Sequence, residues 1–199
     1  MKKTVVYIHG KGGSADEAFR FVPLFREHKV AGLTYRAQTP WDAKAEFPAL
    51  IERVCPGGAP FLLIANSLGA YLALHALADL PVEKAFFISP VVDMEQLIRS
   101  LMAGAGVDED ELRARRELTT PHGETLSWDY LSYVRAHPVV WHAPTEILYG
   151  ENDALVPYES AAAFAARTGA GLTVMPGGEH WFHTAEQLAF LENWIKKAL

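Results

Sequence analysis

Residues 61–70 read FLLIANSLGA, an apolar run that passes through a serine into a second apolar segment. The run Phe61–Ala65 predicts a buried strand, and the segment Leu68–Asp79 predicts a helix. A serine on such a tight strand-to-helix turn projects its hydroxyl above the sheet. Ser67 is therefore a candidate nucleophile, and its surroundings indicate an α/β fold.

The turn around Ser67 has the small residues that its crowding demands. Gly69 stands two positions after the serine, and Ala65, one methyl group larger than the usual glycine, stands two before it. The backbone N–H of Leu68 would face a developing oxyanion. The alternative is an N-cap serine in a Rossmann-like sheet, which would give Ser67 no chemical role.

Short apolar runs and longer amphipathic segments alternate along the rest of the chain. We predict strands at Thr4–Ile8, Val30–Tyr35, Phe61–Ala65, Lys84–Ser89, Glu146–Tyr149 and Leu172–Met175. We predict helices at Ala15–Glu27, Asp42–Val54, Leu68–Asp79, Pro157–Thr168 and Ala185–Ala198. The strands are apolar nearly throughout, as expected when both faces are covered. This alternation predicts a doubly wound, mainly parallel six-stranded sheet with helices on both faces.

About 50 residues separate the fourth strand from the fifth, which is too long for an ordinary loop. We predict that residues 91–143 form a small helical, cap-like insertion within a single domain spanning residues 1–199. The segment Asp108–Glu117 is dense in charges with helical i,i+4 pairs, and Ser127–His137 contributes a further apolar helix face.

Composition excludes several classes of protein. The 199 residues are 50% hydrophobic and 21% charged, which is typical of a globular protein with one substantial core. The net charge of -6 disfavours nucleic acid or anionic lipid as a partner. Cys55 is the only cysteine, so no intrachain disulfide can form and nothing indicates an oxidising compartment.

The first apolar run, Val5–Ile8, is too short for a secretory signal and ends at His9. We therefore expect a cytoplasmic protein that acts on a small-molecule substrate and binds neither nucleic acid nor membrane. The sequence leaves the oligomeric state open.

Three further motifs follow their own predicted strands: YIHGKGG at residues 7–13, GENDALVP at residues 150–157 and GGEHWF at residues 177–182. With these motifs and the serine turn, the sequence resembles the α/β-hydrolase family over essentially its whole length. The family has a His-Gly oxyanion loop, an acid loop and a histidine loop in these places. The resemblance implies a catalytic triad in the order Ser67, Asp153, His180.

The expected division of labour follows from this triad. His180 would take the proton of Ser67, and Asp153 would hold the imidazole in the useful tautomer. Backbone N–H groups of Lys11 and Leu68 would bind the oxyanion. The resemblance thus implies a serine hydrolase that cleaves a small carboxylic ester, thioester or amide through an acyl-enzyme, without a cofactor.

Alternatives remain for both partners of the serine and for the activity. Asp93 could supply the acid, and His183 could replace His180. The chain could also be a catalytically silent binding module, or use the same triad for acyl transfer or carbon–carbon bond hydrolysis. The spacing of His122, His137 and His142 does not suit a metal, so we predict no metal site.

Substrate contacts are the least determined feature of the sequence. Met94 and Trp128, in the predicted insertion, and Trp181, beside the candidate histidine, are expected to contact the substrate. For the insertion, the alternative is that these apolar side chains only pack it onto the sheet.

Overall fold

A computed structural model describes residues 2–121 and 123–199 of the chain. His122, one of the histidines considered for a metal, lies outside the described residues. The chain divides into two compact units, one formed by residues 1–92 and 140–199 and the other by residues 93–139. The second unit lies inside the segment expected as an insertion, and each unit is described below by itself.

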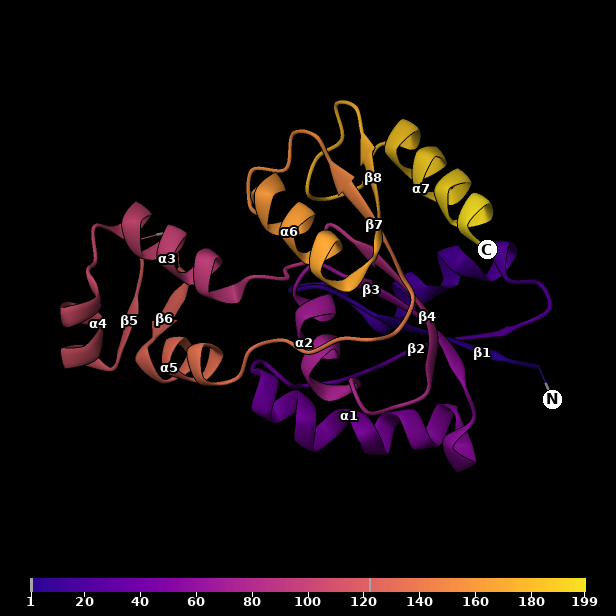
Figure 1. Ribbon diagram of the computed structural model, residues 1–199, viewed down its shortest axis with the longest axis horizontal. Coiled ribbons are helices and arrows are strands. Elements are labelled where there is room, and N and C mark those ends of the chain that lie inside the picture. Colours follow the sequence, from indigo (N-terminus) through magenta and orange to yellow (C-terminus); the bar gives the residue numbers. More distant parts are fainter. Residues whose placement is uncertain (1, 122) are drawn as a thin grey trace. The chain divides into compact units, whose positions relative to one another are not determined.

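The first unit is built on a six-stranded sheet in the order β2-β1-β3-β4-β7-β8 (Figure 1). Its strands are β1 Thr4–Ile8, β2 Lys29–Gly32, β3 Phe61–Asn66, β4 Val82–Ile88, β7 Thr145–Gly150 and β8 Gly171–Met175. Every neighbouring pair is parallel. This arrangement confirms the predicted fold class, and it brings the carboxyl ends of all six strands to one edge.

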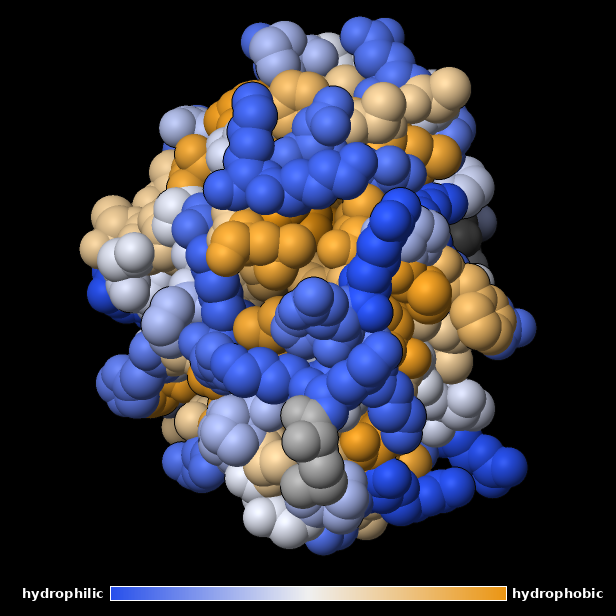
Figure 2. Space-filling view, turned by 90° about the vertical axis from the view of Figure 1, so that its right-hand side faces the viewer, coloured by the Kyte–Doolittle hydropathy of each residue, from blue (hydrophilic) through white to orange (hydrophobic). Residues whose placement is uncertain are grey.

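Helices cover both faces of this sheet (Figure 1). The helices of one face are α1 Pro40–Val54, α2 Leu68–Ala76 and α6 Tyr158–Thr168, and those of the other are η1 Ala15–Leu24 and α7 Ala185–Ala198. Within the described part of the chain, no helix is long and apolar enough to cross a membrane. On the side of the molecule that faces right in Figure 1, hydrophilic residues border hydrophobic ones (Figure 2).

The core on the η1 and α7 side is aromatic at its centre. The ring of Phe86, from β4, makes edge-on contacts with Phe25 at 6.4 Å and with Trp194 at 5.9 Å between centroids. Each of these side chains is at most 5% exposed. Edge-to-face packing of this kind adds to the gain from burial, so the C-cap residue of η1 is packed together with β4 and α7.

The first helix differs from the sequence prediction. We expected a helix at Ala15–Glu27, but the structure has a 3₁₀ helix that ends at Leu24. Pro23 lies inside it, and proline has no N–H for an α-helical bond and clashes with the preceding turn. Tighter i→i−3 bonds, such as Phe25 N–H to the Val22 carbonyl at 3.3 Å, replace the α pattern.

The described residues of the second unit form three helices and a hairpin, which was not predicted from the sequence. The helices are α3 Met94–Ala105, α4 Glu109–Arg115 and α5 Trp128–Ala136, and the antiparallel strands are β5 Glu117–Thr119 and β6 Thr125–Ser127. Arg135 on α5 pairs with Glu95 of α3 at 2.8 Å and with Glu109 of α4 at 2.6 Å. One guanidinium therefore ties the three helices of this unit together.

Candidate active site

Ser67 occupies a strained turn between β3 and α2. Its backbone lies at φ 50° and ψ −122°, a region that non-glycine residues rarely adopt. The surrounding backbone fixes the turn, because Ser67 N–H donates to the Ile88 carbonyl at 3.0 Å. The Ser67 carbonyl accepts from the N–H groups of Ala70 and Val91, each at 3.1 Å. Hydrogen bonds to both the N–H and the carbonyl of Ser67 therefore keep its backbone in this strained conformation.

Gly69 lets helix α2 approach the end of strand β1. A Cβ at this position would lie 2.1 Å from the carbonyl oxygen of His9 and 2.8 Å from that of Ile8. Both distances are far below van der Waals contact, and the obstacle is backbone that cannot swing aside. The small residue after the serine is thus required by close packing.

We predict that Gly69→Ala destabilises the fold by about 1–3 kcal/mol, the usual cost of overpacking. Gly104→Ala is the matched control, because Gly104 lies within helix α3 and a Cβ there would meet nothing within 4 Å. That change should stabilise its helix by about 0.5–1 kcal/mol. Urea unfolding of both variants measures the difference, and equal stabilities would contradict the close approach.

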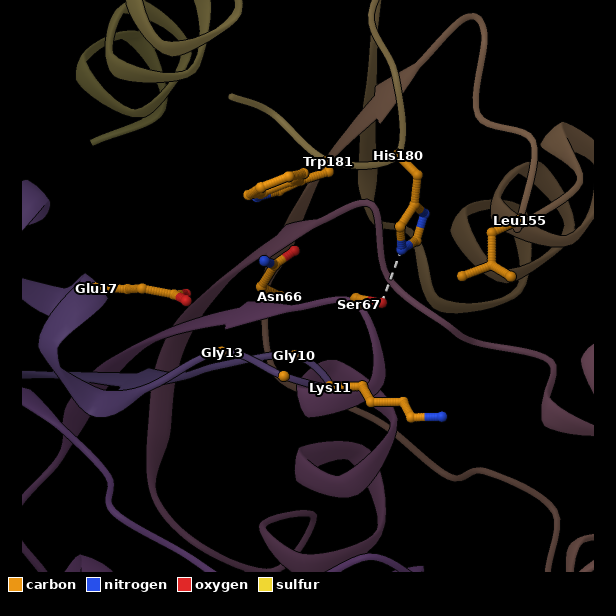
Figure 3. A pocket seen from close by; sticks show the side chains of 10 residues that line it. Gly10, Lys11, Gly13, Glu17, Asn66, Ser67, Leu155, His180 and Trp181 are labelled. Carbon is orange, nitrogen blue, oxygen red and sulfur yellow. Dashed lines mark hydrogen bonds between the residues drawn. The ribbon is translucent and has the colours of Figure 1, made fainter. Parts of the chain in front are cut away.

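Ser67, His180 and Asp153 lie in one hydrogen-bonded chain. The Ser67 Oγ is 2.8 Å from His180 Nε2, and His180 Nδ1 is 2.7 Å from Asp153 Oδ2 (Figure 3 draws the first of these bonds). The carboxylate side chain is fully buried and the imidazole is 21% exposed. Both distances are within hydrogen-bond reach, as a nucleophile, a base and an orienting acid require.

The second oxygen of Asp153 is also held. Its Oδ1 accepts the backbone N–H groups of Leu155 and Val156, each at 2.9 Å. Burial and the nearby charge of Asp153 raise the pKa of Tyr149 above its ordinary value, so this phenol stays protonated. It donates to the Val156 carbonyl at 2.7 Å. Three hydrogen bonds therefore hold the acid loop between Asp153 and Val156.

The acid loop and the histidine loop are in close backbone contact at two glycines, Gly150 and Gly178. A Cβ on Gly150 would lie 2.5 Å from the carbonyl oxygen of Glu179. Beside this contact, Asn152 N–H donates to the Gly178 carbonyl at 2.7 Å. Close backbone contact between the loops after β7 and β8 thus sets the distance from Asp153 to His180.

The loop after β1 lies directly beside the serine. A Cβ on Gly10 would be 3.1 Å from the Cβ of Ser67. His9 is anchored by its ring, which stacks on Tyr35 at 4.3 Å, and by its carbonyl, which accepts from the Tyr35 hydroxyl at 2.6 Å. Lys11 follows this anchored turn, and Leu68 occupies the first turn of α2, where N–H groups lack partners within the helix.

A cavity of about 370 Å³ opens above the serine (Figure 3). Its lining residues are Gly10, Lys11, Gly12, Gly13, Glu17, Asn66, Ser67, Leu155, His180 and Trp181. Among the three expected substrate contacts, Trp181 belongs to this lining. Sequence reasoning missed Glu17, Asn66 and Leu155. Asn66 and Leu155 could have been found as neighbours of Ser67 and Asp153, whereas Glu17 forms a capping box with Ser14 at the start of η1, a pattern that gives no sign of the cavity.

The alternative residues make other contacts. Asp93 caps helix α3 by accepting the N–H of Gln96 at 2.9 Å. The ring of His183 lies 2.7 Å, through Nδ1, from the carbonyl oxygen of Trp181. In the structure it is thus Asp153 that contacts His180, and His180 that contacts Ser67.

Met94 and Trp128 belong to the second unit. Met94 is 5% exposed, and the Trp128 ring carries the guanidinium of Arg113 at 4.6 Å from its centroid. Their contact with a substrate stays a prediction. In the described part of the chain, no three His, Cys, Asp or Glu side chains are grouped so as to hold a metal ion.

The fold recurs in solved structures of low sequence identity. Alpha/beta hydrolase domain-containing protein 10 from mouse has a TM-score of 0.78 at 17% identity, covering 100% of this chain and 90% of that chain. Est1E from Butyrivibrio proteoclasticus has a TM-score of 0.78 at 20% identity, covering 100% and 88%. An esterase from Exiguobacterium antarcticum has a TM-score of 0.65 at 16% identity, covering 98% and 91%.

Sequence comparison identifies the family. No curated protein sequence matches the chain. A model of the alpha/beta hydrolase family matches residues 5–192, which includes the serine turn and both loops of its partners. The chain therefore belongs to the alpha/beta hydrolase family.

Proposed function

We propose that this chain is a serine hydrolase that cleaves a carboxylic ester of a small substrate through an acyl-enzyme. Ser67 is the nucleophile, His180 the general base and acid, and Asp153 the residue that orients the imidazole. The observation that supports this most is the continuous chain of two hydrogen bonds, 2.8 Å and 2.7 Å long, from Ser67 through His180 to Asp153.

The proposed reaction has two steps. In the first, Ser67 Oγ bonds to the ester carbon while its proton passes to His180 Nε2, which then gives it to the departing alcohol. In the second, His180 takes a proton from water as the water oxygen bonds to the acyl carbon; the bond from that carbon to Ser67 Oγ breaks, the proton returns from His180 to Oγ, and the acid leaves. The backbone N–H groups of Lys11 and Leu68 stabilise the oxyanion in both steps.

The choice of an ester, rather than another acyl compound, rests on family and fold. The similar structure from Exiguobacterium antarcticum is an esterase, and the chain needs no cofactor for such a reaction.

The single cysteine, Cys55, is buried and unpaired, which suits the reducing cytoplasm that we propose as the location of the protein.

A series of p-nitrophenyl esters of graded acyl length tests the proposal. We expect turnover preceded by a burst of p-nitrophenol that approaches one equivalent of protein, because an acyl-enzyme accumulates when deacylation is slower. If the chain turns over no ester, thioester or amide, the proposed function is wrong, and the alternatives are a binding module or a triad that acts in acyl transfer or carbon–carbon bond hydrolysis.

The side chain of Lys11 should matter little for neutral esters. A backbone N–H fixed by the turn keeps its value in the transition state, and in the proposed mechanism this N–H, not the ammonium of the side chain, binds the oxyanion. Lys11→Ala should therefore lower kcat for a neutral ester by less than about tenfold. For an acidic ester, the same change should raise KM. A hundredfold fall in kcat on neutral esters, with the fold intact, would show that the ammonium itself stabilises the transition state.

A further inference from the structure

The cavity wall contains a carboxylate that is not part of the proposed triad. Glu17, on the first turn of η1, lines the same cavity as Ser67 and His180. Figure 3 shows its carboxylate pointing into the cavity, below the indole of Trp181 and beyond Asn66. A negative group so placed would repel an anionic substrate and attract a cationic one.

The position of this carboxylate is fixed by the protein. Its Oε2 accepts the hydroxyl of Tyr7, and its Oε1 accepts the N–H of Ser14 at 3.2 Å. Burial and the adjacent Glu17 raise the pKa of Tyr7 above its ordinary value, so the phenol keeps its proton and donates it. Gly13 leaves the needed room, since a Cβ there would lie 2.7 Å from Oε1.

These bonds leave part of the carboxylate available. An ionised carboxylate offers about four acceptor sites, and Tyr7 and Ser14 occupy one on each oxygen. Lys11 is the lysine of the cavity lining, and Figure 3 shows its ammonium pointing away from Glu17. Arg20 is near enough to Tyr7 to act on the pKa of its hydroxyl, but it is outside the cavity lining, so at the cavity wall it is the carboxylate of Glu17 that faces a ligand.

Trp181 supplies a second feature that suits a cation. Its side chain lines the cavity although the residue is 71% exposed, and its ring is held by stacking on His183 at 5.0 Å. The face of an indole attracts positive charge, and aromatic faces commonly serve to bind quaternary ammonium groups. An aromatic face and a carboxylate therefore border the same side of the cavity.

The mechanism determines which part of an ester reaches this side. His180 must give its proton to the leaving oxygen, so the leaving group lies beside Nε2. Figure 3 places Glu17 on the other side of Ser67 from His180 and Leu155. The part of the substrate that can extend toward Glu17 is therefore its acyl chain.

We propose that the substrate of this hydrolase carries a cationic group, an alkylammonium, in its acyl part, and that Glu17 and Trp181 bind it. This inference rests on the proposed function, since it names the substrate class of the same site. Glu17 acts on specificity and takes no part in bond breaking.

A pair of esters that differ only in charge tests the inference. The cationic probe is p-nitrophenyl 4-(trimethylammonio)butyrate, and its neutral isostere is p-nitrophenyl 5,5-dimethylhexanoate. We expect the wild-type protein to prefer the cationic ester by about tenfold or more in kcat/KM. Glu17→Gln should remove most of the preference by raising KM for the cationic ester alone, because it removes binding that is equal in ground and transition states, and the indole of Trp181 accounts for the remainder.

Glutamine keeps the shape and one acceptor of Glu17, and it serves equally well in a capping box. The variant therefore separates the charge of Glu17 from a merely structural role.

Asp16→Asn is the matched control, because Asp16 is an acidic residue of the same helical turn that is outside the cavity lining. It should leave the preference unchanged. Trp181→Leu should lower kcat/KM for the cationic ester more than for the neutral one.

The possible failures are distinguishable. If both esters are hydrolysed and Glu17→Gln leaves their ratio unchanged, the inference is wrong and the proposed function stands. If a preference appears only when the cation is in the leaving group, as in butyrylcholine against 3,3-dimethylbutyl butyrate, the acyl placement is wrong. If the protein hydrolyses neither kind of ester, the proposed function fails and the inference with it.

Discussion

Ser67→Ala should lower kcat for a p-nitrophenyl ester by about 10⁶-fold, and His180→Ala should lower it by a similar factor. The double variant should lose no more than either single variant. The reason is that the serine is a poor nucleophile until the imidazole takes its proton, so removing either residue removes the same step. The 2.8 Å contact between Ser67 Oγ and His180 Nε2 is the structural basis for this coupling.

His183→Ala is the control for the histidine, because His183 lies three residues further on and its Nδ1 is close to the Trp181 carbonyl oxygen. It should change kcat by less than about tenfold. Losses that multiply in the Ser67/His180 double variant would show that the two residues do not share a step. A large loss in His183→Ala, with His180→Ala active, would reverse the assignment of the base.

Asp153→Asn should lower kcat by about 10⁴-fold while leaving the fold intact. Two backbone N–H groups, those of Leu155 and Val156, point at one oxygen of the present carboxylate. The amide oxygen of an asparagine would have to take that place, so its NH₂ would face His180 Nδ1. The imidazole would then carry its proton on Nε2 and could not accept the proton of Ser67.

Asp93→Asn is the matched control for this change, since Asp93 is the other acid that the sequence allowed. Its carboxylate caps helix α3 through the Gln96 N–H, and loss of the charge should cost stability of about 1 kcal/mol at most, with little change in kcat. Steady-state kinetics and urea unfolding of the two variants separate these effects. A kinetic loss confined to Asp93→Asn would contradict the proposed triad.

The regular part of the fold could be predicted because pattern and packing agree there. The limits of β1, Thr4–Ile8, and of α7, Ala185–Ala198, are those expected from the sequence. Both are bounded by strong signals: His9-Gly10 ends the strand, and Thr184 with Gln187 caps the helix. The 3₁₀ geometry of η1 was not predicted, since helical periodicity alone does not distinguish a 3₁₀ helix from an α-helix. Pro23 was the one sequence signal against a regular α-helix there.

The hairpin of the second unit was missed for a different reason. Strands β5 and β6 have three residues each, Glu117–Thr119 and Thr125–Ser127, which is too short for an alternating pattern to show. Leu118 and Leu126, paired across the hairpin, were the only apolar signal. Pairing between such short segments is decided by tertiary contacts rather than by local sequence.

The candidate site also has a part that the sequence predicts and a part that depends on tertiary packing. The sequence motifs fix which residues follow which strands, and the structure brings Ser67, His180 and Asp153 within hydrogen-bond distance. Their chemical roles stay predictions. The position of Glu17 in the cavity wall could not be predicted, because it depends on how the first turn of η1 packs against Tyr7 and Gly13.

Mapping the adduct of a fluorophosphonate probe by peptide mass spectrometry tests the central claim most directly. Such probes react with serines activated by a base. The proposed mechanism predicts a single adduct on Ser67, absent from Ser67→Ala. Ser89→Ala is the matched control. Like Ser67, Ser89 directly follows a strand and has a positive φ, but it is fully buried. The Ser89→Ala variant should be labelled like the wild type. An adduct on another residue, or undiminished labelling of Ser67→Ala, would contradict the proposed mechanism.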